Sequence, residues 1–248
     1  MNSNQSSNMT LEGFQRVHLN SLKQNELMTT QGTLNKILIL SILVFISGFF
    51  GWNLAINFVE FIMPLMITTL IIGVVIALTL AFKPMLAHIL APLYSIIQGF
   101  FLGVISMFFE FMYPGIVIQA LLITSVIAFL MNFLYRAKII KVTEKFRSVI
   151  IFATFGIFGV YLVSLLLNLF TGSSIPLIHE SGLIGIGFSL FVVTIASLNL
   201  LIDFDLIERQ IKAKMPKRME WYGGFVIMVT LIWIYIEVLK LLAKLKNR

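Results

Sequence analysis

Residues Ser197–Leu242, with the sequence SLNLLIDFDLIERQIKAKMPKRMEWYGGFVIMVTLIWIYIEVLKLL, contain two long apolar runs joined by a basic loop. Three carboxylates, Asp203, Asp205 and Glu237, lie within or against these runs. A charged side chain at hydrocarbon depth costs about 3 kcal/mol on insertion scales, so such residues are rare and usually face a partner, a cavity or an ion path. The stretch therefore predicts two membrane-spanning helices with an acidic site. The same reading assigns Glu220, with most of the other acidic residues, to tails or loops.

The composition of the chain indicates a membrane protein. Of its 248 residues, 59% are hydrophobic and 12% are charged, and the mean hydropathy is +0.99, whereas soluble domains carry about 25% charged residues. The absence of cysteine excludes a disulfide framework and a thiolate metal site. The net charge of +7 comes largely from basic residues between apolar runs, which indicates contact with the lipid bilayer rather than with nucleic acid.

Seven apolar runs are long enough to cross a bilayer, which takes about 20 residues of helix. We therefore predict an all-α integral membrane protein, a seven-transmembrane-helix bundle in residues 36–248 that follows a polar N-terminal tail at 1–35. The tail lacks the basic start and apolar run of a signal peptide, so we expect it to be retained. Lys83 and Pro84 divide an over-long run and predict a tight hairpin. The predicted spans are 37–56, 61–82, 85–109, 116–135, 148–170, 183–207 and 222–243.

The distribution of basic residues predicts the orientation in the membrane. Lys and Arg occur in the N-terminal tail and in the second, fourth and sixth connections, and the first, third and fifth connections contain none. The positive-inside rule then places the N-terminus and the even-numbered connections in the cytoplasm of a multi-pass cell-membrane protein. The basic end of the chain, which includes Lys240, Lys244 and Lys246, conflicts with seven crossings. Either the rule fails after the last span, or the final helix does not cross fully.

Helical geometry separates the three acids. At 100° per residue, Asn199 and Asp203 lie one turn apart on one face, and Asp205 points nearly the opposite way. A turn centred on Pro216 places Asp203 opposite about residue 230, which leaves Asp203 and Glu237 about 10 Å apart along the axis. This offset argues against a tight two-carboxylate clamp in a straight hairpin. A kink, a longer loop or a tilt would be needed to close it.

Two of the acids have local explanations that compete with a functional one. Asp205 can lie at the membrane boundary beside Arg209, and Glu237 can form a local ion pair with Lys240, three residues along the helix. Asp203 has no cation within one turn. Asp203 is therefore the strongest functional candidate.

The acids also define the predicted chemistry. Two carboxylates brought close together share a proton and titrate as a unit, and when deprotonated they repel each other or accept a hard cation such as calcium. Asp203, Asp205 and Glu237 are therefore the predicted proton-sensing and calcium-binding residues, and we expect no other cofactor. Four polar residues within the spans are candidates for lining a pathway, namely Asn199, Gln98, Tyr94 and Asn168. Hydrogen bonds between helices would also explain their presence.

Small residues at every fourth position, such as Ser95, Gly99 and Gly103 in the third span, predict close helix packing. Motifs along nearly the whole chain after the tail then point to one family. They are Met28–Thr33, Gly51–Trp52, Ala91–Tyr94, Gly99–Gly103, Val142–Arg147, Leu198–Arg209 and Met219–Tyr222 leading into Glu237. Together these segments resemble the Bax inhibitor-1 (YccA-like, transmembrane Bax inhibitor motif) family of seven-span membrane proteins, in its bacterial branch.

The resemblance implies a central last helix ringed by the other six, a bacterial inner-membrane location, and a pH-sensitive calcium leak gated by acids of the last two spans. For the eukaryotic members it also implies suppression of cell death. Three positions depart from the family pattern. Asp203 and Asp205 both match the single sensor of the sixth span, Glu237 matches the acid of the seventh span to within one turn, and Gln98 replaces a frequent Glu.

Two classes of function compete with a calcium or cation leak channel. The alternative is a non-conducting interaction protein that modulates a membrane protease or translocation complex, which the small-residue faces support weakly. An enzyme is not expected, because a metalloprotease needs two His one turn apart beside a Glu, and His18, His88 and His179 are scattered. Two intramembrane Asp residues would suit an aspartyl protease, which is the remaining enzymatic reading.

Overall fold

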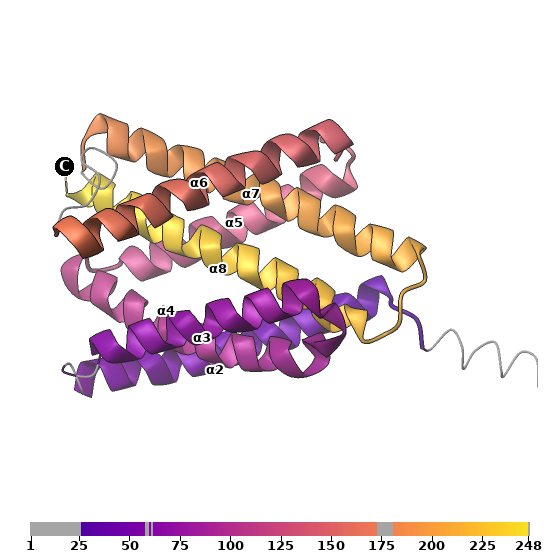
Figure 1. The fold of residues 1–248 in the computed structure, drawn as a ribbon, viewed down its shortest axis with the longest axis horizontal. Helices are drawn as coiled ribbons and strands as arrows, with labels where there is room; N and C mark the ends of the chain where they lie inside the picture. Colours follow the sequence, from indigo (N-terminus) through magenta and orange to yellow (C-terminus); the bar gives the residue numbers. More distant parts are fainter. Residues whose placement is uncertain (1–25, 58–59, 61, 173–180, 248) are drawn as a thin grey trace, which may run out of the picture.

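The computed structural model describes residues 26–57, 60, 62–172 and 181–247 (Figure 1). These residues form seven long helices and one short 3-10 turn, and the seven predicted spans are confirmed as helices long and apolar enough to cross a membrane. The elements are α2 (Thr30–Asn57), α3 (Ile62–Phe82), η2 (Pro84–Leu86), α4 (Ala87–Met112), α5 (Ile116–Arg136), α6 (Glu144–Thr171), α7 (Leu183–Lys212) and α8 (Met219–Lys246).

The outer surfaces of these helices are apolar. Large side chains such as Phe129, Phe152 and Phe155 are 68–75% exposed in the structure. In water such a surface would be an aggregation hazard, whereas in a bilayer it contacts lipid tails. The chain is therefore a multi-pass protein of the lipid bilayer.

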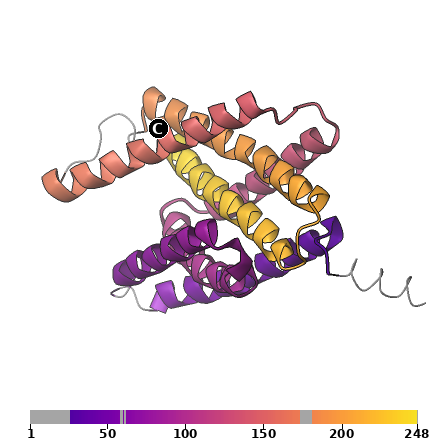
Figure 2. The same ribbon diagram turned by 45° about the vertical axis from the view of Figure 1, so that its right-hand side comes forward.

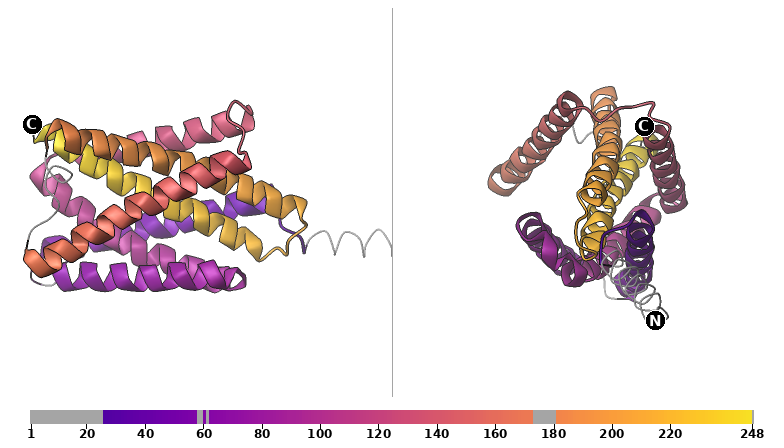
Figure 3. Two further views of the ribbon diagram at one scale, coloured as in Figure 1. Left: turned by 45° about the horizontal axis from the view of Figure 1, so that its top comes forward. Right: turned by 90° about the vertical axis from the view of Figure 1, so that its right-hand side faces the viewer.

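Helix α8 lies at the centre of the bundle, as the resemblance implied. It packs directly against α2, α4, α5 and α7, while α3 packs mainly on α4, and α6 mainly on α7 (Figure 3). The side chains of α8 that face these neighbours include Leu239 and Ile234, each fully buried. The ring around α8 is thus made chiefly by four helices, with α3 and α6 further out.

The predicted small-residue face of α4 is used for close packing against α2. A Cβ atom added to Gly103 would lie 1.9 Å from the carbonyl oxygen of Gly48, and one added to Gly99 would lie 2.5 Å from that of Val44. The hydroxyl of Ser47 donates a 2.5 Å hydrogen bond to the carbonyl of Ile96. Glycine at these positions lets two backbones touch, which is how helices gain packing energy in lipid.

The connections between helices follow local rules. The predicted tight hairpin is confirmed: α3 ends at Phe82, and Pro84 begins the short turn that leads into α4. Helix α6 begins after Thr143, whose hydroxyl accepts a hydrogen bond from the N–H of Phe146, as an N-cap should. Glu110 accepts hydrogen bonds from the N–H groups of Gly115 and Val117 at the start of α5.

The last two helices form a long hairpin (Figure 2). Helix α8 has 28 residues, about 42 Å of helix at 1.5 Å per residue, and it ends at the opposite end of the bundle from the start of α2 (Figure 1). This length favours a full crossing by the final helix. If the N-terminus is cytoplasmic, as the charge rule predicts, the basic C-terminal end is then the exception to that rule.

Candidate functional site

The acidic residues of α7 and α8 lie at three separate places in the bundle. Asp203 of α7 is partly buried and accepts a 2.6 Å hydrogen bond from the hydroxyl of Thr230 on α8. This pairing confirms the expected level of Asp203 opposite residue 230. In the part of the chain that the structure describes, no Lys or Arg forms an ion pair with Asp203. Among the described residues, its hydrogen-bond partner is the neutral hydroxyl of Thr230.

Asp205 faces a different neighbour, as the helical step of 100° predicts. Its carboxylate forms ion pairs with Arg147 of α6 at 2.5 Å and with Arg209, one turn further along α7, at 2.7 Å. Arg209 also contacts Glu144 at 3.0 Å, near the start of α6. Asp205 therefore joins the ends of α6 and α7. This arrangement agrees with the boundary interpretation of Asp205 beside Arg209 and adds Arg147, which sequence reasoning missed.

Glu237 is almost completely buried, with 1% of its surface exposed. One carboxylate oxygen accepts a 3.0 Å hydrogen bond from the ammonium of Lys240, and the other accepts a 2.8 Å bond from the hydroxyl of Tyr161 on α6. The local ion pair with Lys240 is thus present. Burial of the carboxylate is supported by a cation and by a hydroxyl, so both of its oxygens have a partner.

The structure does not bring the three predicted acids together. Thr230, the partner of Asp203, precedes Glu237 by seven residues of α8, which is about 10 Å of helix. Within the described ranges no group of three or more His, Cys, Asp or Glu residues is placed to hold a metal ion. The proposed calcium ligands Asp203, Asp205 and Glu237 are therefore separate sites in this conformation, in line with the offset found from the sequence.

The four candidate pathway residues lie in different environments. Asn199 donates to the hydroxyl of Thr154 on α6 at 2.9 Å, and so links α7 to α6. Gln98 is 6% exposed and fills the space beside Gly73 of α3. Tyr94 is buried with its ring against that of Phe225 on α8. Asn168 is exposed on α6. The first three therefore contribute to helix contacts, whatever further role they have.

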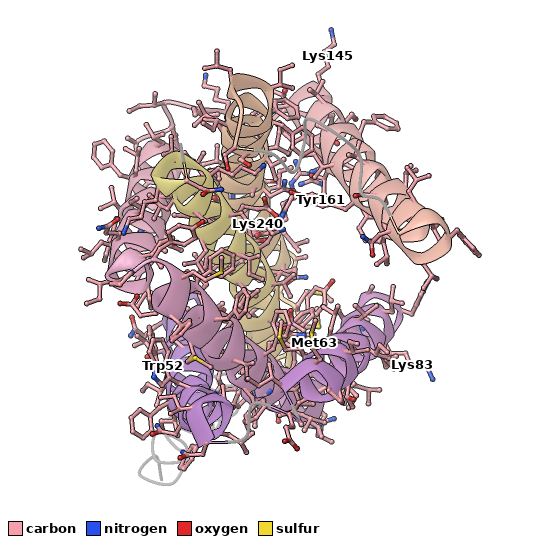
Figure 4. The ribbon with its side chains drawn as sticks, turned by 90° about the vertical axis from the view of Figure 1, so that its left-hand side faces the viewer. Trp52, Met63, Lys83, Lys145, Tyr161 and Lys240 are labelled. Carbon is pink, nitrogen blue, oxygen red and sulfur yellow. The ribbon has the colours of Figure 1, made fainter. Side chains whose placement is uncertain are left out.

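Two cavities open beside α8. One of about 390 Å³ lies between α4, α6, α7 and α8 and is lined by residues that include Tyr161, Ser189, Lys240 and Lys244. In Figure 4, Tyr161 and Lys240 lie close together beside α8, whereas Lys83 and Lys145 point away from the bundle. The other cavity, of about 730 Å³, lies between α2 and α5 and is mainly apolar. The smaller cavity is lined by Tyr161 and Lys240, the two partners of Glu237.

Glu220 is a buried carboxylate that sequence reasoning placed in a loop, and the structure corrects that assignment. It lies in the first turn of α8, is 1% exposed, and accepts hydrogen bonds from both the N–H (3.1 Å) and the hydroxyl (3.0 Å) of Thr29. The segment before α2 is held nearby, because Met28 donates to the carbonyl of Met215 and Lys217 donates to that of Glu26. The adjacent Trp221–Tyr222 pair was the available signal that the span begins this early.

Helix α2 begins at Thr30, inside the predicted tail of residues 1–35. Residues 1–25 of that tail, and also His18 and His179, lie outside the described residues. His88 is described and has its Nδ1 atom 3.0 Å from the carbonyl oxygen of Met85, beside the α3–α4 turn.

Fold and buried acids together define a seven-helix membrane protein with carboxylates on its last two helices. A family model described as Bax inhibitor 1 like matches residues 2–247. The chain therefore belongs to the Bax inhibitor 1 like family, and the resemblance seen in its motifs is confirmed. Comparison with curated proteins and with solved structures gave no match.

Proposed function

We propose that this membrane protein is a pH-sensitive leak channel for calcium or related cations, gated by the carboxylates of α7 and α8. Asp203 carries the proposal, because it lies between these two helices with a neutral hydroxyl as its hydrogen-bond partner. An uncompensated charge at such depth is costly, and binding a proton or a cation removes that cost. Protonation and cation binding then compete for one carboxylate, which links flux to pH.

The other two acids have different parts in this proposal. Asp205 forms ion pairs with two guanidinium groups, those of Arg147 and Arg209, so its role in this proposal is to hold α6 against α7. Glu237 is held by Lys240 and Tyr161 at the far side of the same hairpin, next to the smaller cavity. A cation that passes along α8 would meet Asp203 and Glu237 in turn, as two successive carboxylates about 10 Å apart.

The test is a flux assay on purified protein in liposomes. Wild-type protein should release or admit calcium at a rate that changes with pH. Asp203→Asn removes the charge and keeps the shape, so we expect at least a tenfold loss of the pH dependence. Asp205→Asn is the matched control two residues away, and its pH profile should keep the wild-type shape. If Asp203→Asn, Asp205→Asn and Glu237→Gln all leave the flux and its pH dependence unchanged, the carboxylate mechanism is wrong.

The alternative, a non-conducting interaction protein, was suggested by the small-residue faces. The face of α4 that contains Gly99 and Gly103 is filled by α2 of the same chain, so it offers no surface to another protein. The Gly73 position of α3 is likewise covered by the side chain of Gln98. The packing therefore removes the support that these small-residue faces gave to the alternative. Absence of calcium flux at every pH, together with a stoichiometric membrane-protein partner in pull-downs, would favour the alternative.

A further inference from the structure

The surroundings of Glu237 have the form of a cation site that already holds a cation. The ammonium nitrogen of Lys240 lies 3.0 Å from Oε1 of Glu237 and 4.7 Å from the centre of the Tyr161 ring. Oε2 of Glu237 accepts the Tyr161 hydroxyl at 2.8 Å. A carboxylate oxygen and an aromatic face both attract an ammonium group, and here both are directed at that of Lys240, while the carboxylate oxygen is also a ligand for hard cations.

The acid and the ammonium differ in their freedom to move. The side chain of Glu237 is 2% exposed, and that of Lys240 is 39% exposed at the same contact. Lys240 also lines the cavity of about 390 Å³, which leaves room for its flexible four-carbon chain to move away from Glu237. The carboxylate is thus fixed in the bundle, while the ammonium that neutralises it can leave.

A second lysine in the same cavity has a different arrangement. Lys244 donates hydrogen bonds to the carbonyl of Gly185 at 3.0 Å and to the hydroxyl of Ser189 at 2.8 Å, both on α7. Lys244 therefore links α8 to α7 through these two hydrogen bonds. It has the same charge as Lys240 and lines the same cavity, and these two hydrogen bonds hold its ammonium against α7. It is a matched control for the role of Lys240.

We propose that Glu237 and Tyr161 form a binding site for a small inorganic cation such as calcium, and that the ammonium of Lys240 is a tethered occupant that competes with it. The inference rests on the proposed leak function and adds its regulation: the leak is low while Lys240 occupies the site. When the ammonium moves into the cavity, Oε1 of Glu237 becomes a free oxygen ligand. Water from the cavity supplies the further oxygens that calcium requires.

The binding test uses terbium ion, a luminescent calcium substitute that nearby aromatic side chains sensitise. Terbium is titrated into purified wild-type protein and into Lys240→Met, Glu237→Gln/Lys240→Met and Lys244→Met. We expect terbium to bind Lys240→Met at least tenfold more tightly than wild type. The part of the terbium emission that reports this tighter binding should be absent from the double variant, which lacks the Glu237 carboxylate. Lys244→Met removes a nearby charge but leaves Lys240 in contact with Glu237, so it should gain much less affinity than Lys240→Met. No gain in Lys240→Met, or an equal gain in Lys244→Met, overturns the inference.

A second substitution at Lys240 keeps the test valid if Lys240→Met does not fold. Lys240→Gln removes the charge but keeps a hydrogen-bond donor for Glu237, and it should also bind terbium more tightly than wild type. Calcium should raise the melting temperature of Lys240→Met by clearly more than that of the double variant, which keeps Asp203 but lacks the Glu237 site, because a ligand stabilises the folded state that binds it. If calcium shifts both variants equally, the site is not at Glu237.

The flux assay separates this inference from the function on which it rests. If the leak proposal holds, Lys240→Met should raise calcium flux several-fold over wild type, and the double variant should lose that gain. Wild-type flux that depends on Asp203 but does not respond to Lys240→Met would overturn the tethered occupant and leave the leak intact. If no variant conducts, the leak proposal fails, and the terbium titration alone decides whether the cation site exists.

Discussion

Glu220 and Glu237 are two buried glutamates of the same helix, and their surroundings differ in kind. They lie seventeen residues apart, about 25 Å along α8, and each is 1% exposed. Glu220 is bound by the backbone N–H and the hydroxyl of Thr29, which are neutral donors just before α2. Glu237 is bound by the side chains of Lys240 and Tyr161, beside a cavity.

One residue type thus has a closely packed environment with neutral donors at one end of a helix, and a cationic partner that lines a cavity at the other. At the Glu220 end there is no spare room, since a Cβ atom on Gly32 would lie 2.0 Å from Oε1 of Glu220. The N-terminus of α2 also points its partial positive charge at this carboxylate. At the Glu237 end, the cationic partner is a flexible side chain that is 39% exposed.

The largest expected effect is that of Glu220→Ala. It removes a fully buried side chain, together with its two hydrogen bonds to Thr29, and leaves a cavity at the start of α8, so the free energy of unfolding should fall by about 4 kcal/mol. Glu237→Ala should cost about 2 kcal/mol, because Lys240 can turn into the cavity and be hydrated. Both values can be measured by SDS titration of the purified proteins in mixed micelles. An equal or larger loss in Glu237→Ala would break the comparison.

Gly32→Ala tests the lack of room beside Glu220. The added methyl group would push the carboxylate away from Thr29, and we expect a loss of about 3 kcal/mol from overpacking and weakened hydrogen bonds. Gly156→Ala is the control, since no atom lies within 4 Å of its Cβ position on α6. It should be neutral or slightly stabilising, because alanine favours a helix by about 1 kcal/mol over glycine. Similar losses in both variants would mean that the space beside Gly32 is not limiting.

Tyr161→Phe isolates one partner of Glu237. It keeps the ring beneath Lys240 and removes the hydroxyl that donates to Oε2, so the expected loss is about 1 kcal/mol in the same SDS titration. Because the aromatic face remains, the binding of terbium to Lys240→Met should persist when Tyr161→Phe is added. Loss of terbium binding in that double variant would show that the hydroxyl, rather than the ring, shapes the site.

The smallest effect should come from Glu144→Gln, a glutamate at the surface. Its ion pair with Arg209 is exposed, with side-chain exposures of 73% for Glu144 and 47% for Arg209. Exposed pairs contribute about 0.5 kcal/mol or less and weaken with salt. The unfolding free energy of this variant therefore gives the baseline against which the two buried glutamates are compared. A loss above that of Tyr161→Phe would mean that the α6–α7 boundary network is stronger than its exposure implies.

Several features of the site were predictable from local rules. The opposite directions of Asp203 and Asp205 follow from the helical step, and the level of Asp203 with Thr230 follows from a hairpin centred near Pro216. The pair between Glu237 and Lys240 follows from their spacing of three residues. Each of these depends only on residues of α7, α8 or the loop that joins them.

The features that were missed involve contacts between distant segments. Glu220 appeared to be a loop residue because charge marks the end of a hydropathy window, yet it is buried and accepts hydrogen bonds from Thr29, 191 positions away. Arg147 of α6 reaches Asp205 across 58 positions. Tyr161 reaches Glu237 across 76 positions. Local periodicity carries no information on which helices become neighbours.

The amino-acid sequence alone establishes seven spans, their order and the faces on which the acids lie. It can do so because a bilayer leaves helices as the available form for each apolar run and the helical repeat sets every side-chain direction. The partners of those acids were established only by the folded bundle. In lipid, helices associate through shape, small residues and a few hydrogen bonds. Which donor meets Glu220 or Glu237 therefore depends on how all the helices fit together.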